Sequence, residues 1–219
     1  MAKPNHNAPA DHWFLKAPRL NRTFLYSFLV IWGILGLCFV LVGSNDFMLA
    51  VQYPRAELLD GLMLIWTQLG EAHSAILLFF ALYLIYRKQD QWKTVRNAFI
   101  LSVLLAAIVP QGLKWIFADC PRPWALFPDV KEIPGLTKSN YKSFPSGHTA
   151  FATALAALWA SLAPNKFQYP ILLAVLAFGV GYSRIHLHMH WLHDVLAGGL
   201  VGLICTYFGL RHAEFTQTS

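Results

Sequence analysis

Long apolar stretches separated by short polar breaks make up most of the chain. A helix that crosses a bilayer needs about 20 mostly apolar residues, and residues 23–43 provide such a stretch without a charged side chain. Later stretches have the same character and carry polar residues mainly toward their ends. The pattern predicts six membrane-spanning helices, at residues 23–43, 74–86, 98–117, 149–163, 169–182 and 195–210.

Residues 57–69 follow a different pattern. Glu57 and Asp60 interrupt a series of large apolar side chains at helical spacing. A helix with one polar and one apolar face is suited to lie in the plane of the membrane surface. The expected fold is therefore all-α: an integral membrane six-transmembrane-helix bundle with an additional interfacial amphipathic helix. Residues 1–219 are expected to form a single domain.

The composition supports a membrane protein. Apolar residues make up 56% of the 219 residues and charged residues 13%, whereas a soluble domain has about 25% charged residues. This balance excludes a disordered chain and argues against a water-soluble globule. The formal net charge is +6, but the 17 Lys and Arg residues are scattered in short segments. We therefore expect no nucleic-acid partner.

The basic residues also predict the orientation in the membrane. An even number of spans places both termini on one side, and cytoplasmic loops carry an excess of Lys and Arg. Ten basic residues fall on the side of the termini and seven on the other. We expect cytoplasmic termini, residues 1–22 as a cytoplasmic N-terminal segment, and a location in a bacterial inner membrane. The ten residues are Lys3, Lys16, Arg19, Arg22, Arg87, Lys88, Lys93, Arg96, Lys166 and Arg211.

Three polar clusters fall beside the outer ends of the last four predicted spans. The first contains a lysine and an arginine, the second is a Pro-Ser-Gly-His segment that opens a span, and the third combines an arginine, a histidine and a carboxylate. All three are expected to face the periplasm or the outside. Their candidate site residues are Lys114, Arg122, Ser146, Gly147, His148, Arg184, His190 and Asp194.

These residue types suit the chemistry of a phosphate group. Guanidinium binds phosphate in a bidentate way and ammonium adds a point charge, while Ser146 and Gly147 at a helix start add N–H groups and the positive end of the dipole. Such a site holds its substrate without a metal or another cofactor. His190 and Asp194 are four residues apart and share a face on a helical turn, so the carboxylate fixes the tautomer of an attacking imidazole. His148, from another helix, can protonate the leaving oxygen.

The clusters resemble the three signature motifs of the type 2 phosphatidic acid phosphatase family, the integral-membrane lipid phosphate phosphatases. Residues 145–148 and 183–194 match the second and third motifs residue for residue, within a motif core at about 98–210. The first motif departs from the family pattern, because seven residues rather than six separate Lys114 from Arg122. The family is similar to the expected fold in having a six-helix core with its site at the outer face.

The resemblance implies a metal-independent mechanism with a phosphohistidine intermediate. It makes His190 the nucleophile, Asp194 the residue that orients it, and His148 the general acid. It also implies a set of residues that bind phosphate and stabilise the transferring group. These are Lys114, Arg122, Ser146, Gly147 and Arg184.

The substrate implied by the resemblance is a membrane lipid that carries a terminal phosphate. Undecaprenyl pyrophosphate, phosphatidylglycerol phosphate, phosphatidic acid and a lipid A phosphate all qualify, and no residue selects among them. Transfer of the phosphate to another lipid would use the same residues. A non-catalytic lipid binder or transporter is a third reading, although binding alone does not require His190, Asp194 and His148 in these positions. The oligomeric state is left open.

Two further groups of polar residues have alternative readings. His186 and His190 have the spacing of a helical metal pair, but the role of His190 in the family argues against a metal site. Glu71 and His73, at the start of the second predicted span, either cap a helix or line a substrate entrance, and we favour the cap. Several tryptophans, including Trp191, are expected in an aromatic belt at the membrane surface.

Overall fold

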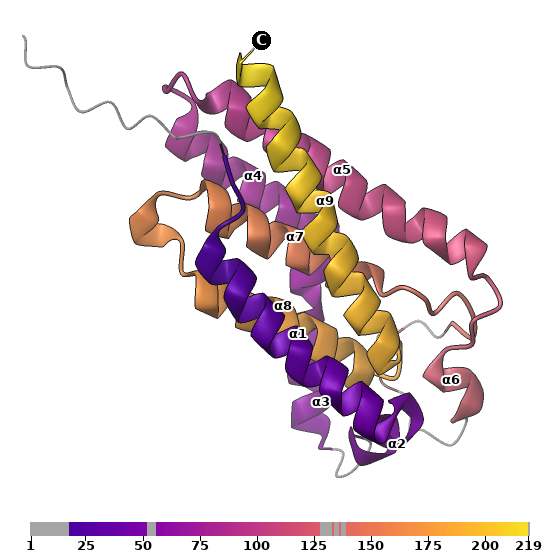
Figure 1. The fold of residues 1–219 in the computed structure, drawn as a ribbon. Helices are drawn as coiled ribbons and strands as arrows, with labels where there is room; N and C mark the ends of the chain where they lie inside the picture. Colours follow the sequence, from indigo (N-terminus) through magenta and orange to yellow (C-terminus); the bar gives the residue numbers. More distant parts are fainter. Residues whose placement is uncertain (1–17, 52–55, 128–132, 134–135, 137–138, 219) are drawn as a thin grey trace, which may run out of the picture.

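The computed structural model describes residues 18–51, 56–127, 133, 136 and 139–218, and within these ranges the regular structure is helical (Figure 1). Of the N-terminal segment expected at 1–22, residues 1–17 lie outside the described part. The α-helices are α1 Arg22–Val42, α2 Ser44–Val51, α3 Glu57–Thr67, α4 Ala72–Tyr86, α5 Trp92–Ile116, α6 Pro123–Leu126, α7 Gly147–Leu162, α8 Pro170–His186 and α9 Leu192–Thr218. Short 3-10 turns are η1 Gln68–Gly70 and η2 Asn165–Phe167.

Helix α7 is the centre of the bundle and packs against α5, α8 and α9 (Figure 1). Most of its side chains are buried, and many of them are alanines. Small side chains let helices approach closely, which favours helix packing in a membrane, where apolar burial alone gives little driving force. The alanines of α7 therefore explain why this helix lies inside the bundle rather than at its lipid-facing surface.

Glycines allow α9 to lie directly against its neighbours. A Cβ on Gly202 would lie 2.1 Å from the carbonyl oxygen of Ala150 in α7. On the other side of α9, a Cβ on Gly199 would lie within 2.1 Å of the ring of Trp32, whose indole N–H donates to the carbonyl of Leu196 at 3.1 Å. Helix α9 is thus held between α7 and α1 at distances that admit no side chain at these positions.

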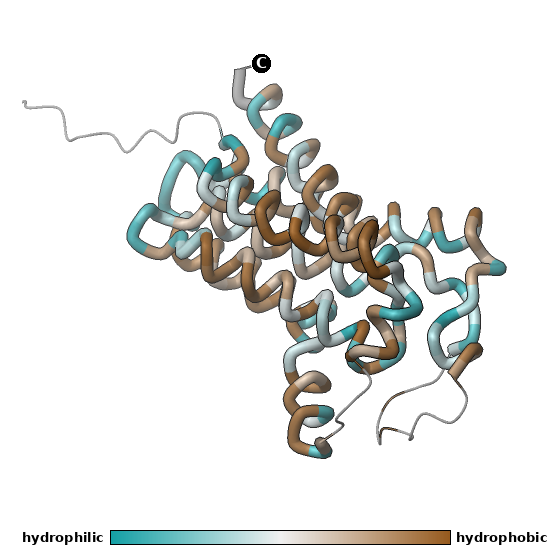
Figure 2. The backbone as a smooth tube through the Cα atoms, turned by 60° about the horizontal axis from the view of Figure 1, so that its bottom comes forward, coloured by the Kyte–Doolittle hydropathy of each residue, from teal (hydrophilic) through white to brown (hydrophobic). Residues whose placement is uncertain are grey.

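The helices agree with the predicted apolar stretches, and they identify an integral membrane protein. Among the described residues, four helical segments are long and apolar enough to cross a membrane, namely Arg22–Val42, Trp92–Ile116, Asn165–His186 and Leu192–Thr216. The count becomes five if α3 and α4, which are bent by 55° relative to each other, form one broken span. Helix α7, with 16 residues, is short for a span, so the number six stays a prediction. Figure 2 shows hydrophobic stretches along the helices and hydrophilic positions in the connecting turns.

Helix α3 forms where the amphipathic helix is predicted, and it packs against α8. The indole N–H of Trp66 donates to the carbonyl of Leu176 at 3.2 Å, and its ring occupies the space where Gly179 lacks a side chain. Asp60, expected on the polar face, has its carboxylate 2.7 Å from Nε2 of the buried His186. The acidic side of α3 therefore makes a specific contact with the bundle. That α3 lies in the plane of the membrane stays a prediction.

The approach of α9 to α7 gives a test of this packing. Gly202→Ala adds a Cβ that collides with backbone, so we expect a loss of about 1–3 kcal/mol in the free energy of unfolding. Thermal unfolding in detergent measures this as a lower midpoint. Gly112→Ala is the matched control, because a Cβ there has no atom within 4 Å and alanine is the better helix former. An equal midpoint for the two variants would contradict the packing described.

Candidate active site

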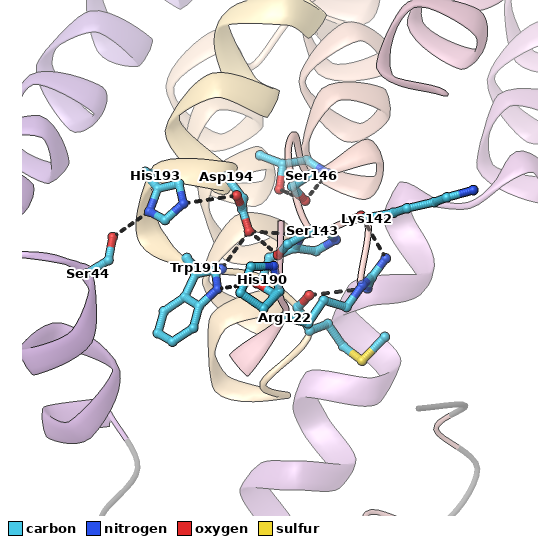
Figure 3. A network of polar contacts seen from close by, with 12 residues as sticks. Ser44, Arg122, Lys142, Ser143, Ser146, His190, Trp191, His193 and Asp194 are labelled. Atoms are coloured by element: carbon cyan, nitrogen blue, oxygen red, sulfur yellow. Dashed lines mark hydrogen bonds and ion pairs between the residues drawn. The ribbon is translucent and has the colours of Figure 1, made fainter. Parts of the chain in front are cut away.

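The predicted site residues come together at one end of the bundle, where α5 and α8 finish and α7 and α9 begin; we call this the site end. The backbone N–H of Ser146 donates to the carbonyl of Asp194 at 3.0 Å, which joins the starts of α7 and α9. The backbone N–H of His190 donates to the carbonyl of Arg184 at 3.2 Å. Figure 3 shows His190 and Asp194 beside Ser143, Ser146 and Arg122.

His190 lies in the turn between α8 and α9, not on a helix. The expectation of a shared helical face with Asp194 is therefore wrong in its geometry, because α9 begins only at Leu192. The two side chains still meet: Nδ1 of His190 lies 3.4 Å from Oδ2 of Asp194, and both residues are buried. His188, at φ 57°, supplies the left-handed backbone position that reverses the chain here.

Asp194 is held by groups from two segments of the chain, the loop before α7 and the residues around the start of α9. Its Oδ2 accepts the hydroxyl of Ser143 and the backbone N–H of Trp191, the latter at 2.9 Å. Its Oδ1 lies 3.3 Å from Nε2 of His193, whose Nδ1 lies 2.8 Å from the hydroxyl of Ser44 in α2 (Figure 3). A buried carboxylate needs such donors to remain ionised, so these contacts preserve the charge that faces His190.

The surroundings of His190 keep its imidazole neutral. The pKa of His190 is lowered to about 3, mainly by burial and also by the nearby Arg122 and Arg184, while Asp194 opposes the shift. Because Asp194 Oδ2 lies 3.4 Å from Nδ1, the carboxylate favours the tautomer with its proton on that nitrogen and a lone pair on Nε2. A neutral imidazole with a free Nε2 is the form that attacks phosphorus.

Arg122 makes a different set of contacts from the expected phosphate ligand. Its guanidinium donates to the carbonyls of Tyr141 at 3.0 Å, Met189 at 3.2 Å and Lys142 at 3.4 Å. These bonds tie the segment before Ser143 to the residue before His190. Burial lowers the pKa of Arg122 and the nearby Asp194 raises it. Two of its five N–H groups take no part in these three bonds.

Arg184 has the geometry of an anion ligand. Its Nη1 donates to the hydroxyl of Thr67 at 2.9 Å, which fixes the side chain against the end of α3. Its Nε is buried and has no hydrogen-bond partner in the described part of the chain. A buried donor without an acceptor is costly, and a phosphate oxygen would satisfy it.

Lys114 points into the site despite the additional residue before Arg122. Helix α5 ends at Ile116, and the irregular backbone that follows absorbs the extra residue. The ammonium nitrogen of Lys114 lies 3.7 Å from where a Cβ on Gly147 would stand. Its closeness to Arg122, Arg184 and Asp194 places a third cation in the cluster.

The start of α7 combines a cap with free N–H groups. Ser146 is the N-cap, because its hydroxyl accepts the N–H of Thr149 at 3.4 Å, and it is fully buried. The N–H of Ser146 is bonded to Asp194, whereas those of Gly147 and His148 begin the helix and have no preceding turn to accept them. In this segment the N–H groups of Gly147 and His148 are therefore available to an anion, whereas the hydroxyl of Ser146 is occupied by the cap.

Sequence analysis missed three contributors to the site. Ser143 bonds Asp194, Thr67 bonds Arg184, and the carboxylate of Glu71 lies 2.5 Å from Nε2 of His148. Only Glu71 has a signal in the sequence, as an acidic residue at the start of an apolar span, which predicts either a cap or a substrate entrance, with the cap favoured. The structure overturns the cap, because the side chain of Glu71 makes no capping bond to α4.

The other histidines and Trp191 have structural contacts. His186 lies against Asp60, and Nδ1 of His188 donates to the carbonyl of His186 at 3.0 Å. In the described ranges, no three His, Cys, Asp or Glu side chains converge as metal ligands would. Trp191 is buried, and its indole N–H donates to the carbonyl of Pro121 at 2.8 Å. It therefore belongs to the core beneath the site, contrary to its expected place in a surface belt.

Comparison with known proteins identifies the family. A model of the PAP2 superfamily matches residues 96–216, which is more than half of the chain and contains all three motifs. The chain belongs to the PAP2 superfamily. This confirms the resemblance to type 2 phosphatidic acid phosphatases.

The relatives are phosphatases. The undecaprenyl-diphosphatase of Sulfolobus acidocaldarius is 25% identical over 199 residues, which cover 88% of this chain and 92% of the relative. The lipid A 4'-phosphatase of Porphyromonas gingivalis is 32% identical over 72% of this chain and 66% of its own. Lipid phosphate phosphatase 1 of Arabidopsis thaliana is 30% identical over 51% of this chain, which spans only 42% of that longer relative. These names agree with an enzyme that hydrolyses phosphoric esters.

Two crystal structures share the fold. Aquifex aeolicus LpxE superposes with a TM-score of 0.62 at 28% identity, over 77% of this chain and 94% of the other. A PAP2-type phosphatidylglycerolphosphate phosphatase from Bacillus subtilis superposes with a TM-score of 0.56 at 23% identity, over 88% and 96% of the two chains. The helical arrangement around the site end is therefore a PAP2 transmembrane fold.

The lowered pKa of His190 predicts a dependence of stability on pH. An unfolded histidine takes up its proton near pH 6.5, whereas folded His190 resists it down to about pH 3. Between these values the unfolded chain binds one more proton, so stability falls as the pH falls, by up to about 1.4 kcal/mol per pH unit. The asparagine variant His190→Asn lacks this contribution, and its unfolding midpoint in detergent should fall less steeply below pH 6.5 than that of the wild type. Parallel curves would show that His190 is not held neutral.

Proposed function

We propose that this protein removes the terminal phosphate from a membrane lipid phosphate or pyrophosphate through a phosphohistidine intermediate, without a metal. The observation that carries the proposal is the neutral, buried His190 held against Asp194 beside a cluster of cations. A nucleophile with an orienting carboxylate, next to groups that stabilise a transferring phosphoryl group, has no use in a protein that only binds its lipid.

The reaction follows from these positions. Lys114, Arg184 and the N–H groups at the start of α7 hold the phosphate oxygens. Nε2 of His190 attacks phosphorus, the bond from phosphorus to the lipid oxygen breaks, and His148 donates a proton to that oxygen. Water activated by His148 then attacks the phosphohistidine, the P–N bond breaks, and inorganic phosphate leaves with His190 neutral again.

An apolar groove beside the site supports a lipid substrate. It has a volume of about 240 Å³ and lies between α4, α7 and α8, with Ala152, Leu155 and Trp159 along one face of α7. Ala152 is one helical turn after His148, so the groove continues from the site along the helices. A lipid chain in this groove would bring its phosphate to the site end.

The relatives suggest the range of substrates. Their names include undecaprenyl-diphosphatase, lipid A 4'-phosphatase and phosphatidylglycerophosphatase B. We propose a substrate of this class, among undecaprenyl pyrophosphate, phosphatidylglycerol phosphate, phosphatidic acid and lipid A.

We also propose that the site end faces the outside of a bacterial cytoplasmic membrane. Basic residues gather toward the helix ends and turns opposite the site end, and the positive-inside rule favours such residues in the cytoplasm. They are Arg22, Arg87, Lys88, Lys93, Arg96, Lys166 and Arg211.

Phosphate release from purified protein tests the function. With EDTA present, we expect inorganic phosphate from at least one member of a panel of long-chain lipid phosphates and pyrophosphates, and none from the asparagine variant His190→Asn. Full activity of that variant would refute the mechanism, and loss of wild-type activity with EDTA would indicate a metal. Appearance of the phosphate on a second lipid, with none in solution, would indicate transfer instead of hydrolysis.

The cations are expected to contribute unequally. Arg184→Ala removes a planar fork whose buried Nε needs an acceptor, so we expect kcat/KM to fall by on the order of 10²–10³. Lys114→Ala removes a single point charge and should cost less. Steady-state kinetics on one lipid phosphate measures both, and equal losses would show that Lys114 contributes as much as the guanidinium.

A further inference from the structure

The break between α3 and α4 brings an acidic residue into the site that none of the three motifs contains. Gly70 lies directly against the start of α7, since a Cβ on it would stand 2.8 Å from the carbonyl oxygen of His148. The 55° bend begins at this point, and Glu71 is the next residue. The bend therefore delivers the side chain of Glu71 to His148.

The carboxylate of Glu71 contacts the imidazole of His148. Its Oε1 lies 2.5 Å from Nε2, which is within hydrogen-bond distance. Glu71 occupies the N-cap position of α4, yet its side chain caps nothing there. The Glu71 side chain is 44% exposed and that of His148 27% exposed, so the pair lies at the mouth of the site rather than in the core.

The charges around His148 explain what the carboxylate does. The imidazole faces three charged groups from three elements, namely Glu71 at the start of α4, Lys114 on α5 and Arg184 on α8. Burial is the largest influence on the imidazole and lowers the pKa of His148, Arg184 and Lys114 lower this pKa further, and Glu71 at hydrogen-bond distance raises it. A general acid must carry its proton at the pH of the reaction, and Glu71 is the group here that supports this state.

We propose that Glu71 is a positioning residue for the reaction, which orients His148 and increases the fraction of its protonated form, the proton donor. This inference rests on the proposed function. The Nε2–H of His148 stays bonded to the Glu71 carboxylate. The proton that passes to the leaving lipid oxygen comes from the other ring nitrogen, and the ring becomes neutral as the bond from oxygen to phosphorus breaks.

Kinetics of the glutamine variant Glu71→Gln test the proposal with two substrates. With dioctanoyl phosphatidate, whose alcohol leaving group needs a proton, we expect kcat to fall at least about tenfold at neutral pH. The alkaline limb of kcat/KM should move about one unit to lower pH, because less imidazolium remains without the carboxylate. With p-nitrophenyl phosphate, whose leaving group needs no proton, the loss should be smaller.

Two control variants separate this role from a structural one. Asp46→Asn removes the same charge from exposed Asp46 of α2 and should leave both profiles unchanged. Glu71→Asp keeps the charge and should restore part of the alkaline limb. Equal losses on both substrates, or an unshifted limb in the glutamine variant, would overturn the proposal.

A direct titration distinguishes failure of the inference from failure of the proposed function. In the full chain with ¹⁵N-labelled histidine, His148→Asn identifies the imidazole signals of His148. Their titration midpoint should move to lower pH in the glutamine variant, whether or not any lipid is hydrolysed. An unchanged midpoint refutes the role of Glu71, whereas a shifted midpoint in a protein without phosphatase activity refutes only the function.

Discussion

The close approach of α9 to α7 is the constraint on which the site depends. Gly202 and Gly198 bring the α9 backbone against Ala150 and Ser146, and a Cβ on Gly198 would stand 2.4 Å from the Ser146 carbonyl oxygen. The same approach lets the N–H of Ser146 bond the carbonyl of Asp194. The same contacts thus set two things. They fix the packing of α9 on α7, and they fix where the start of α7 lies relative to the carboxylate of Asp194. A displacement of α9 would change both together.

Burial of charge is the second constraint, and the chain meets it with backbone and hydroxyl partners. Asp194 accepts hydrogen bonds from Ser143 and from the backbone N–H of Trp191, and the ring of His193 lies 3.3 Å from its other carboxylate oxygen. The guanidinium of Arg122 donates mainly to backbone carbonyls, and these bonds join the loop before α7 to the turn between α8 and α9. The remaining positive charge, on Lys114 and Arg184, is concentrated where an anionic group would enter. The arrangement therefore separates residues that build the site from residues that face its ligand.

The helices and the three clusters could be predicted from the sequence because each depends on residues that are close together along the chain. Long apolar runs predict membrane-spanning helices, and α1 agrees with the predicted span to within one residue at each end. Contacts between distant segments leave no such pattern. Ser143 is one serine in a polar loop, and Glu71 has the spacing of a cap although its partner is 77 residues away. His190 was placed on a helical turn because spacing alone does not show that α9 starts two residues later.

The order of the elements along the chain has a consequence for biosynthesis. Glu71, Lys114, Arg122 and His148 come from segments that leave the ribosome before α8 and α9, whereas His190 and Asp194 arrive with the last helix pair. A partly inserted chain therefore contains Lys114, Arg122 and His148 without Arg184, His190 and Asp194. The proposed nucleophile and its carboxylate meet the start of α7 only when α9 packs against this helix, so the candidate site is completed in the last step of assembly.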